Sequence, residues 1–277
     1  MKKILFPTDF SANANNAFNY ALHLAAKLGA DIITLHAYKM PQIHVAHLPN
    51  TAYQIMEQQT ENEFAQYQKA AQEMHEQAEN EHLSQVNIIH MLEEGLTVDK
   101  ILEVSEKENV DIIVLGTTGA TGLKQVFLGS NAARVIDFAK CPVLAIPDSA
   151  RYSSIKRIAY ACSFEKIEKK HIEEAISFTR LFNNAELHLI HADTTHTYIG
   201  EKRMNQLRSE YSQFNDIFFH VIDTLDVIEG VDFYVQNNDI DILAMFTHHR
   251  NFLEKLVTVS YTQQMAYQTK TPLLALH

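Results

Sequence analysis

The chain has 277 residues, a formal net charge of −11 at pH 7, and a composition of 46% hydrophobic and 21% charged residues. This length accommodates two domains of ordinary size, each able to bury its own core, and the composition is typical of a globular protein. The negative net charge argues against a nucleic-acid-binding surface, which needs clustered Lys and Arg. No apolar run is long enough to span a membrane.

The N-terminus and the cysteines indicate where the protein works. Met1-Lys2-Lys3 leads straight into a short strand that ends at Pro7, which is not the pattern of a signal peptide. Cys141 and Cys162 form no C-x-x-C pair, and neither has the surroundings of a nucleophile. We therefore expect a protein of the reducing cytoplasm.

Predicted strands and helices alternate along the first half of the chain. Strands are expected at 4–6, 31–37, 86–91, 112–115 and 143–146, and helices at 13–28, 56–82, 98–109 and 132–139. Gly29 is expected to close the first helix, and residues 38–55 to form an irregular excursion. The helix at 56–82 is polar and lacks sustained heptad spacing, so we expect a surface flank or lid. The alternation predicts a parallel sheet with helices on both faces.

The second half of the chain repeats the first. Residues 216–276 align with 86–146 at a constant offset of 130 without a gap. The repeat predicts two copies of one five-stranded domain, 1–148 and 155–277. The last strand of each copy follows a proline, as an edge strand can, and an open apolar edge invites pairing. We therefore predict that the two final strands pack against each other.

A glycine-rich loop follows the buried strand at 112–115. It holds 4 of the 8 glycines in the chain, Gly116, Gly119, Gly122 and Gly129. Glycine is used where the backbone takes positive φ or approaches another group closely, so the loop predicts a bound ligand. Ser130 is the expected N-cap of the next helix, whose free N–H groups and positive dipole end can bind an anion.

These residues carry a family resemblance. Gly116, two residues, Gly119, nine residues and Gly129-Ser130 resemble the G-2x-G-9x-G-[ST] signature of ATP-binding universal stress proteins. The Asp-Ile-Ile-Val strand before the loop and the Cys-Pro-Val-Leu-Ala-Ile segment after it are similar to the family pattern, as is the segment 3–11. The repeat resembles tandem members, in which two copies pack as an internal pseudo-dimer. The resemblance implies a doubly wound α/β domain in each copy, Rossmann-like and of the adenine nucleotide α-hydrolase type.

The same resemblance implies a nucleotide site in the first copy. ATP, AMP or ADP is the expected ligand, with Mg²⁺ held only through the nucleotide, near Asp9. The alternative for Asp9 is a carboxylate that braces its loop or caps the helix. The expected binding residues are Pro7, Thr8, Asp9, His36, Ala37, Leu115, Gly116, Thr117, Thr118, Gly119, Gly129, Ser130 and Asn131.

Some of these residues have equally simple structural explanations. His36 and Ala37 are expected beside the adenine, yet His191 occupies the place of His36 in the second copy, which favours a structural role. Thr117 and Thr118 either contact phosphate or serve the loop alone.

The second copy lacks the signature. Four residues replace the glycines and one replaces Asp9, namely Phe246, His249, Phe252, Val259 and Ser163, and only Ser260 matches. We therefore expect the second copy to keep the fold without the site, so that one nucleotide binds per chain.

No metal site is expected from the 15 histidines of the chain. The most visible groupings are His44 with His47, His75 with His82, and His248 with His249. His44 and His47 lack the neighbouring carboxylates or cysteines that would complete a tetrahedral zinc site, and solvated histidines are the expectation for each grouping.

The expected function is a nucleotide-dependent regulatory module of the stress response in the cytoplasm. A nucleotide-consuming enzyme is disfavoured because the Walker A and G-x-G-x-x-G loops are absent and no residue stands out as a general base. Slow ATP hydrolysis stays open, as does an interaction scaffold without a ligand. The expected partners are an adenine nucleotide and the other half of the same chain. A further homo-oligomer is left open, and neither nucleic acid nor membrane is expected.

Overall fold

A computed structural model describes residues 3–40, 49–117, 129–164, 168–196, 198–247, 265 and 270–277. The elements of the first half are β1 (Lys3–Pro7), α1 (Ala12–Leu28), β2 (Asp31–Tyr38), α2 (Pro49–Asn80), β3 (Ile88–Glu94), α3 (Thr97–Lys107), β4 (Ile112–Gly116), α4 (Ser130–Phe138) and β5 (Val143–Ile146). The elements of the second half are β6 (Arg157–Ala161), α5 (Glu168–Thr179), β7 (Glu186–Asp193), α6 (Tyr198–Glu210), β8 (Ile217–Asp223), α7 (Val227–Asn237), β9 (Ile242–Phe246) and β10 (Leu273–Leu276).

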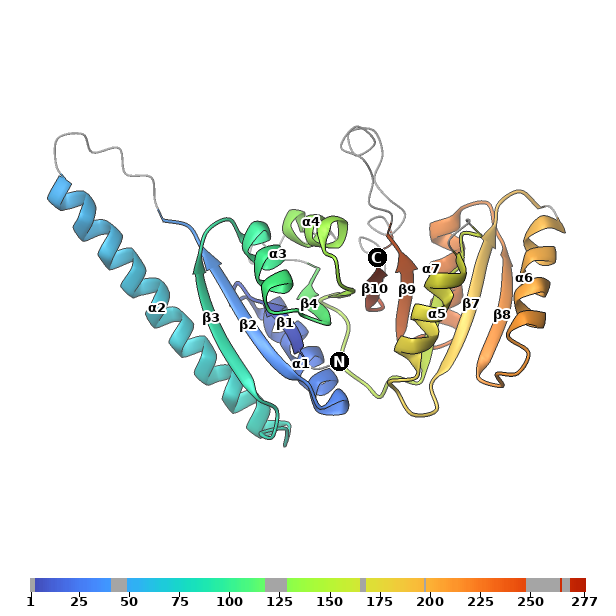
Figure 1. Ribbon diagram of the computed structural model, residues 1–277, viewed down its shortest axis with the longest axis horizontal. Helices are drawn as coiled ribbons and strands as arrows, with labels where there is room; N and C mark the ends of the chain where they lie inside the picture. Colours follow the sequence, from blue (N-terminus) through green and yellow to red (C-terminus); the bar gives the residue numbers. More distant parts are fainter. Residues whose placement is uncertain are drawn as a thin grey trace.

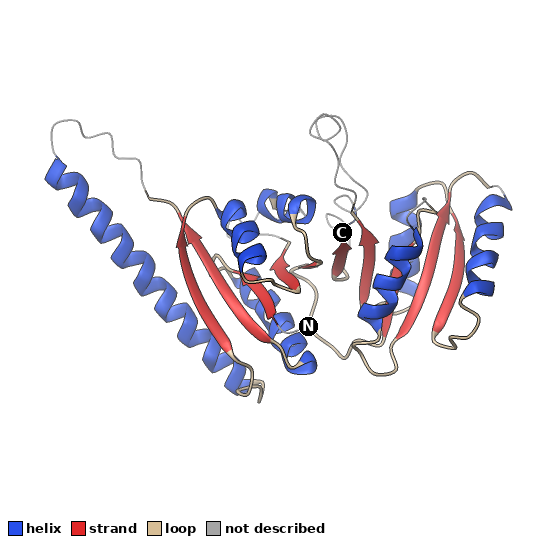
Figure 2. Ribbon diagram, viewed as in Figure 1, coloured by secondary structure: helices blue, strands red, loops and turns tan. Residues whose placement is uncertain are grey.

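The strands form a 10-stranded sheet in the order β3-β2-β1-β4-β5-β10-β9-β6-β7-β8 (Figure 1). Within each half all the strand pairs are parallel. Helices cover both faces of the sheet (Figure 2). The predicted α/β fold with two repeated five-stranded domains is confirmed. None of the described helices is long and apolar enough to cross a membrane.

Two hydrophobic cores lie on opposite faces of the sheet. In β1, Ile4 and Phe6 belong to the core under α1, α2, α5 and α6, whereas Leu5 belongs to the core under α3, α4 and α7. All three side chains are fully buried. This alternation follows from the two-residue period of a strand, and it explains why the parallel strands read as continuous apolar runs.

The two halves join through their last strands. β5 and β10 pair antiparallel, with Leu144 opposite Leu274 at the centre of the short ladder. Each half therefore covers the edge that the other would leave open. The predicted pairing of these two strands is confirmed.

The connection between the halves is held against α1. The side-chain amide of Asn16 donates to the carbonyl oxygens of Pro147 (3.3 Å) and Ala150 (2.9 Å). The ring of Tyr152 stacks on His23, with 4.1 Å between ring centroids and 5° between planes. The segment after β5 is thus anchored to the first domain.

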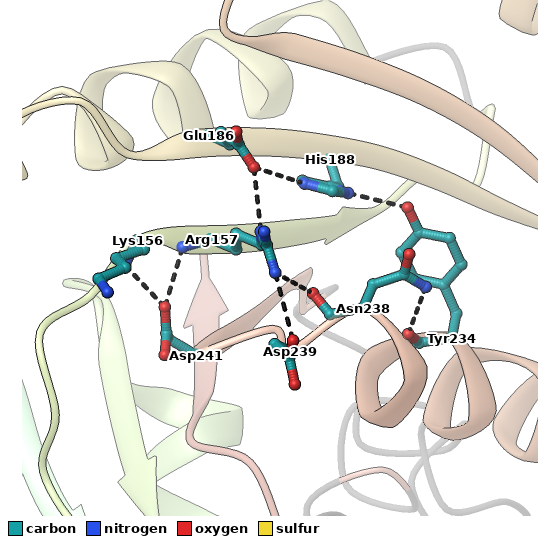
Figure 3. Close-up of polar contacts among 8 residues, drawn as sticks. All are labelled: Lys156, Arg157, Glu186, His188, Tyr234, Asn238, Asp239 and Asp241. Carbon is teal, nitrogen blue, oxygen red and sulfur yellow. Dashed lines mark hydrogen bonds and ion pairs between the residues drawn. The ribbon is translucent and has the colours of Figure 1, made fainter.

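A polar network fastens the amino ends of the strands in the second half (Figure 3). One carboxylate oxygen of Asp241 accepts from the backbone N–H groups of Lys156 (2.6 Å) and Arg157 (2.9 Å). The Arg157 guanidinium donates to Glu186 (3.1 Å) and to the carbonyl oxygen of Asn238 (3.2 Å), at the end of α7. The network ties β6 to β7 and to the start of β9.

The first half uses the same device with a different cation. Asp111 accepts from the backbone N–H of Lys3 (3.0 Å), and the Lys3 ammonium donates to the carbonyl oxygen of Glu108 (3.0 Å), just after α3. A cation at the end of a helix is also favoured by the helix dipole. The repeat seen in the sequence therefore extends to individual hydrogen bonds.

Two sequence-based expectations need correction. The helix predicted at 56–82 begins at Pro49 instead, where a proline fits the first helical position because its missing N–H has no partner there anyway. The alignment of the two halves also contains a gap. Thr34 pairs with His90, whereas the equivalent Leu189 pairs with Phe219, so β3 and β8 are related by 129 positions and α3 and α7 by 130. The extra residue lies in the turn before α7, where Leu225 is 89% exposed.

Candidate functional site

A cavity of about 350 Å³ opens at the carboxyl ends of β1, β2 and β4. β1 lies between β2 and β4 in the sheet, so the chain changes direction across the sheet at this point. Such switch points are where open α/β sheets bind ligands, and the volume is that of a small-molecule site. The cavity is lined by Pro7, Thr8, Asp9, Leu35, His36, Ala37, Thr97, Ile101, Leu115, Gly116, Thr117, Gly129, Ser130, Asn131, Ala132 and Val135.

All the predicted binding residues that the structure describes line this cavity. Two further predicted residues, Thr118 and Gly119, lie outside the described residues. Five lining residues were missed by the sequence analysis, namely Leu35, Thr97, Ile101, Ala132 and Val135. Thr97 and Ile101 belong to the first turns of α3, and no sequence motif connects this helix with the glycine-rich loop. The predicted turn at Gly95, just before α3, was the sequence feature that could have pointed to them.

The two described ends of the glycine-rich loop meet at the cavity. The Thr117 N–H donates to the carbonyl oxygen of Ile146 (3.0 Å), which fixes this residue to β5. The Thr117 carbonyl oxygen in turn accepts from the Gly129 N–H at 2.6 Å. Thr117 is only 4% exposed, so this end of the loop is held by the core of the domain.

The first residues of α4, Ser130, Asn131 and Ala132, line the cavity. The N-cap is Gly129, with φ −58° and ψ 146°, and Ser130 is the first helical residue, not the cap that we predicted. The first bond within the helix runs from the Ala133 N–H to the Gly129 carbonyl oxygen (3.0 Å). The N–H groups of residues 130–132 therefore have no acceptor within the helix. Donors of this kind at the positive end of a helix favour an anion.

The two described glycines of the loop, Gly116 and Gly129, do not take a left-handed backbone. Among the described glycines, positive φ occurs at Gly29 and Gly95, and neither belongs to the signature. Any residue can adopt the backbone angles of Gly129. Gly129 lines the cavity, where a side chain would compete with a ligand for space.

Asp9 braces its loop and lines the cavity as well. Its Oδ1 accepts from the Ser11 N–H (3.1 Å), so the structural alternative considered for this residue is present. Ser11 is the N-cap of α1, and its hydroxyl oxygen accepts from the Ala14 N–H (3.2 Å). The exposed Asp9 carboxylate lies at the cavity wall. The same carboxylate can thus brace the loop and face a ligand in the cavity.

His36 is held on three sides. Its Nδ1–H donates to the carbonyl oxygen of Thr8 (2.8 Å), because a carbonyl can only accept. Its ring stacks on Phe10, with 4.2 Å between ring centroids, and Phe10 takes a left-handed φ of 62°. Its Nε2 lies 3.4 Å from a carboxylate oxygen of Glu63 on α2. α2 therefore flanks the sheet and reaches a residue of the cavity.

The same arrangement recurs in the second half. The Nδ1–H of His191 donates to the carbonyl oxygen of Cys162 (2.9 Å). Its ring lies 4.2 Å from that of Phe164, which again takes a left-handed φ of 58°. Since the brace is present in both copies, it belongs to the fold and not only to a binding site.

Phe246, which stands in the second half where Gly116 stands in the first, was expected to block the second site, but its ring lies on the other face of the sheet. The Phe246 ring stacks on the buried His171 of α5, with 3.3 Å between centroids. It packs in the core under α5, whereas the first-half cavity lies on the face covered by α3 and α4. The ring therefore does not fill the corresponding space. The other replacements, His249, Phe252 and Val259, and the matching Ser260, lie outside the described residues, as do His44, His47 and His248.

Cys141 is a partly buried free thiol. Burial raises its pKa to about 11, so the thiol keeps its proton at neutral pH.

Comparison with known proteins identifies the family. Residues 1–147 match the sequence model of the universal stress protein family. The chain belongs to this family. It is 32% identical to universal stress protein MJ0531 of Methanocaldococcus jannaschii over 145 residues, which cover 52% of this chain and 81% of that protein.

Whole-chain relatives show the two-domain form of the family. Universal stress protein Slr1230 of Synechocystis is 26% identical over 296 residues, which cover 99% of each chain. The crystal structure of a universal stress protein from Archaeoglobus fulgidus superposes with a TM-score of 0.70 at 18% identity, covering 99% of this chain and 95% of that one. The tandem fold is thus shared along the full length.

Proposed function

We propose that the first domain, residues 1–148, binds one adenine nucleotide, ATP in the first instance, in the cavity between β1, β2, β4 and α4. The protein then acts as a nucleotide-dependent regulatory module of the stress response in the cytoplasm. One observation carries the proposal: both described ends of the signature loop and the Asp9 carboxylate line the same cavity.

The lining residues offer what each part of a nucleotide needs. Leu35, Ile101 and Val135 provide apolar walls for a base. The N–H groups at the start of α4 that have no acceptor within the helix suit phosphate oxygens. The Asp9 carboxylate suits ribose hydroxyls or a magnesium ion carried by the phosphates. Among the described residues, no group of three or more His, Cys, Asp or Glu side chains could hold a metal ion, so Mg²⁺ would enter with the nucleotide.

Binding fits the cavity better than turnover. Two of the described lining side chains can transfer protons, Asp9 and His36. The nitrogens of His36 face the Thr8 carbonyl oxygen and Glu63, and Asp9 accepts from the Ser11 N–H. Both groups thus serve the loops around the cavity. A slow hydrolytic activity, if measured, should be lost in the same variants that lose binding.

The second domain, residues 155–277, has a structural role in this proposal. Its β10 covers the edge strand β5 of the first domain, as a dimer partner would. The replacement of all four loop glycines and of Asp9 supports a stoichiometry of one nucleotide per chain.

Two measurements test the proposal. Purified protein is denatured, and the released small molecules are separated by ion-exchange chromatography, where an adenine nucleotide is expected. Nucleotide-free protein is then titrated with ATP and Mg²⁺ by calorimetry, and saturation is expected near one equivalent. Folded protein that releases no nucleotide and shows no saturable binding would favour the scaffold without a ligand.

A further inference from the structure

Two histidines meet where α2 packs on the edge of the sheet. The Nε2 atoms of His75 on α2 and His90 on β3 lie 3.1 Å apart. Their rings are nearly perpendicular, at 79°, with 5.2 Å between centroids. The grouping visible in the sequence was His75 with His82, but His82 follows the end of α2 and takes a left-handed φ of 56°. The pair seen in the structure joins residues of two different elements.

Hydrogen bonds determine which nitrogen of His90 carries its proton. Tyr67 donates its hydroxyl hydrogen to the Thr34 carbonyl oxygen (2.9 Å), and burial, which raises the Tyr67 pKa to about 12, keeps that hydrogen in place. The Thr34 hydroxyl hydrogen is then donated to the Tyr67 hydroxyl oxygen (2.9 Å) or to the Ile89 carbonyl oxygen (3.5 Å). Consequently the Thr34 hydroxyl oxygen accepts from His90 Nδ1–H (2.7 Å). In neutral His90 the lone pair is on Nε2, directed at His75.

We propose that His75 and His90 form a binding site for a divalent transition-metal ion that prefers imidazole ligands, such as Zn²⁺. Zinc binds histidine nitrogen at about 2.0–2.1 Å with tetrahedral geometry, which places two ligand nitrogens about 3.3 Å apart. The observed 3.1 Å is a hydrogen bond in which His75 Nε2–H donates to His90 Nε2. On metal binding the His75 proton moves to its Nδ1, and the two rings turn until both Nε2 lone pairs point at the ion. Imidazole suits zinc, copper and nickel, whereas magnesium and calcium prefer oxygen.

The surroundings of the pair support this assignment. The bond from His90 Nδ1–H to Thr34 is the kind of outer contact that orients metal-binding histidines. His75 is exposed, so the ion has access from solvent.

The site supplies two protein ligands, and water completes the coordination. No third candidate ligand joins the pair in the described part of the chain. The ion links α2 to β3, so binding should stabilise the packing of this helix on the sheet. The same helix carries Glu63, which contacts His36 at the cavity. Metal binding thus acts on an element that touches the candidate nucleotide site.

A calorimetric titration of metal-free, full-length protein with Zn²⁺ tests the site. One equivalent should bind to the wild type and to His82→Gln, a matched control that changes an exposed histidine near the same end of α2. His75→Gln and His90→Gln should each lose this equivalent. Since His75 is exposed, its substitution leaves the fold intact, which circular dichroism checks.

A second variant tests the outer contact. Thr34→Val keeps the side-chain shape and removes the acceptor for His90 Nδ1–H, so the affinity for Zn²⁺ should fall about 10- to 100-fold. Cu²⁺ bound to the wild type should also give an electron paramagnetic resonance spectrum with coupling to two imidazole nitrogens. The proposal is overturned if the wild type binds no Zn²⁺, or if His75→Gln binds it with unchanged stoichiometry and affinity.

Discussion

The backbone N–H of Gly129 donates to the carbonyl oxygen of Thr117 over 2.6 Å. This bond closes the glycine-rich loop at its base and places its second end beside the strand that precedes it. Thr117 is anchored to β5 through the Ile146 carbonyl oxygen, so the start of α4 is positioned by the sheet itself. The donors of the first helical turn therefore have a fixed direction before a ligand arrives, which lowers the cost of binding.

Gly129→Val should remove nucleotide binding without unfolding the protein. The backbone angles of Gly129, φ −58° and ψ 146°, are allowed for valine, so the turn is not strained. Valine is a poorer N-cap than glycine, and the expected loss of stability is about 1 kcal/mol. Gly129 lines the cavity, so the valine side chain should take up space that the nucleotide needs. The affinity for ATP should fall at least tenfold, and a tenfold loss corresponds to about 1.4 kcal/mol of binding free energy. Gly129→Ala is the control, with a smaller effect, and calorimetry on folded variants gives the answer.

Asp9→Asn separates the two roles of Asp9. The asparagine oxygen can still accept from the Ser11 N–H, so the loop and the stability of the protein should be unchanged. The negative charge is lost, and affinity for ATP with Mg²⁺ should fall by about tenfold. Asp9→Ala, which removes the brace as well, should also lower the melting temperature. Equal nucleotide affinity for Asp9→Asn and the wild type would assign Asp9 to the loop alone.

Local signals in the sequence predicted the fold well. Gly29 was expected to close α1, and it does so with φ 60° and ψ 41°. The proline before each final strand predicted an edge, and those edges pair with Leu144 opposite Leu274. These features depend on residues that lie next to each other in the chain, which is why the sequence reveals them.

Features that depend on tertiary contacts were missed. The start of α2 was missed because Pro49 was taken to mark an irregular segment, although proline fits the first position of a helix. The one-residue shift between β3 and β8 was missed because both strands are apolar in either register. The contribution of Thr97 to the cavity and the contact of His75 with His90 join elements that no local pattern connects.

The paired histidines His36 and His191 allow a matched test of the brace. His36→Phe and His191→Phe keep an aromatic ring against Phe10 and Phe164 and remove the donor to the strand-end carbonyl oxygen. Each should lower the free energy of unfolding by about 1–2 kcal/mol, because a carbonyl oxygen loses its partner. Only His36→Phe should also change ATP affinity, since His36 lines the cavity. Urea unfolding and calorimetry on both variants decide this, and equal effects on ATP affinity would contradict it.

Acid should destabilise the protein below a pH of about 6.5. Burial lowers the pKa values of His90, His188 and His220 from the ordinary 6.5. The unfolded chain therefore binds more protons than the folded chain as the pH falls through 6.5, and the free energy of unfolding decreases. Above this pH all three rings are neutral in both states, and their contribution is fully present.

Part of the expected loss of stability in acid arises in the second domain, where His188 contacts Tyr234. His188 Nδ1 lies 2.8 Å from the Tyr234 hydroxyl, and its ring lies 5.7 Å from that of His220 (Figure 3 shows the first contact). Glu186 and Arg157 also face His188, and their effects on its pKa oppose each other, with Glu186 raising and Arg157 lowering it. Urea unfolding at steps from pH 7.5 to 5.5 should show falling stability, in a range above the ordinary pKa values of carboxyl groups. His220→Gln removes one of the titrating rings and should make the dependence shallower, whereas constant stability of the wild type across this range would show that the buried histidines do not control it.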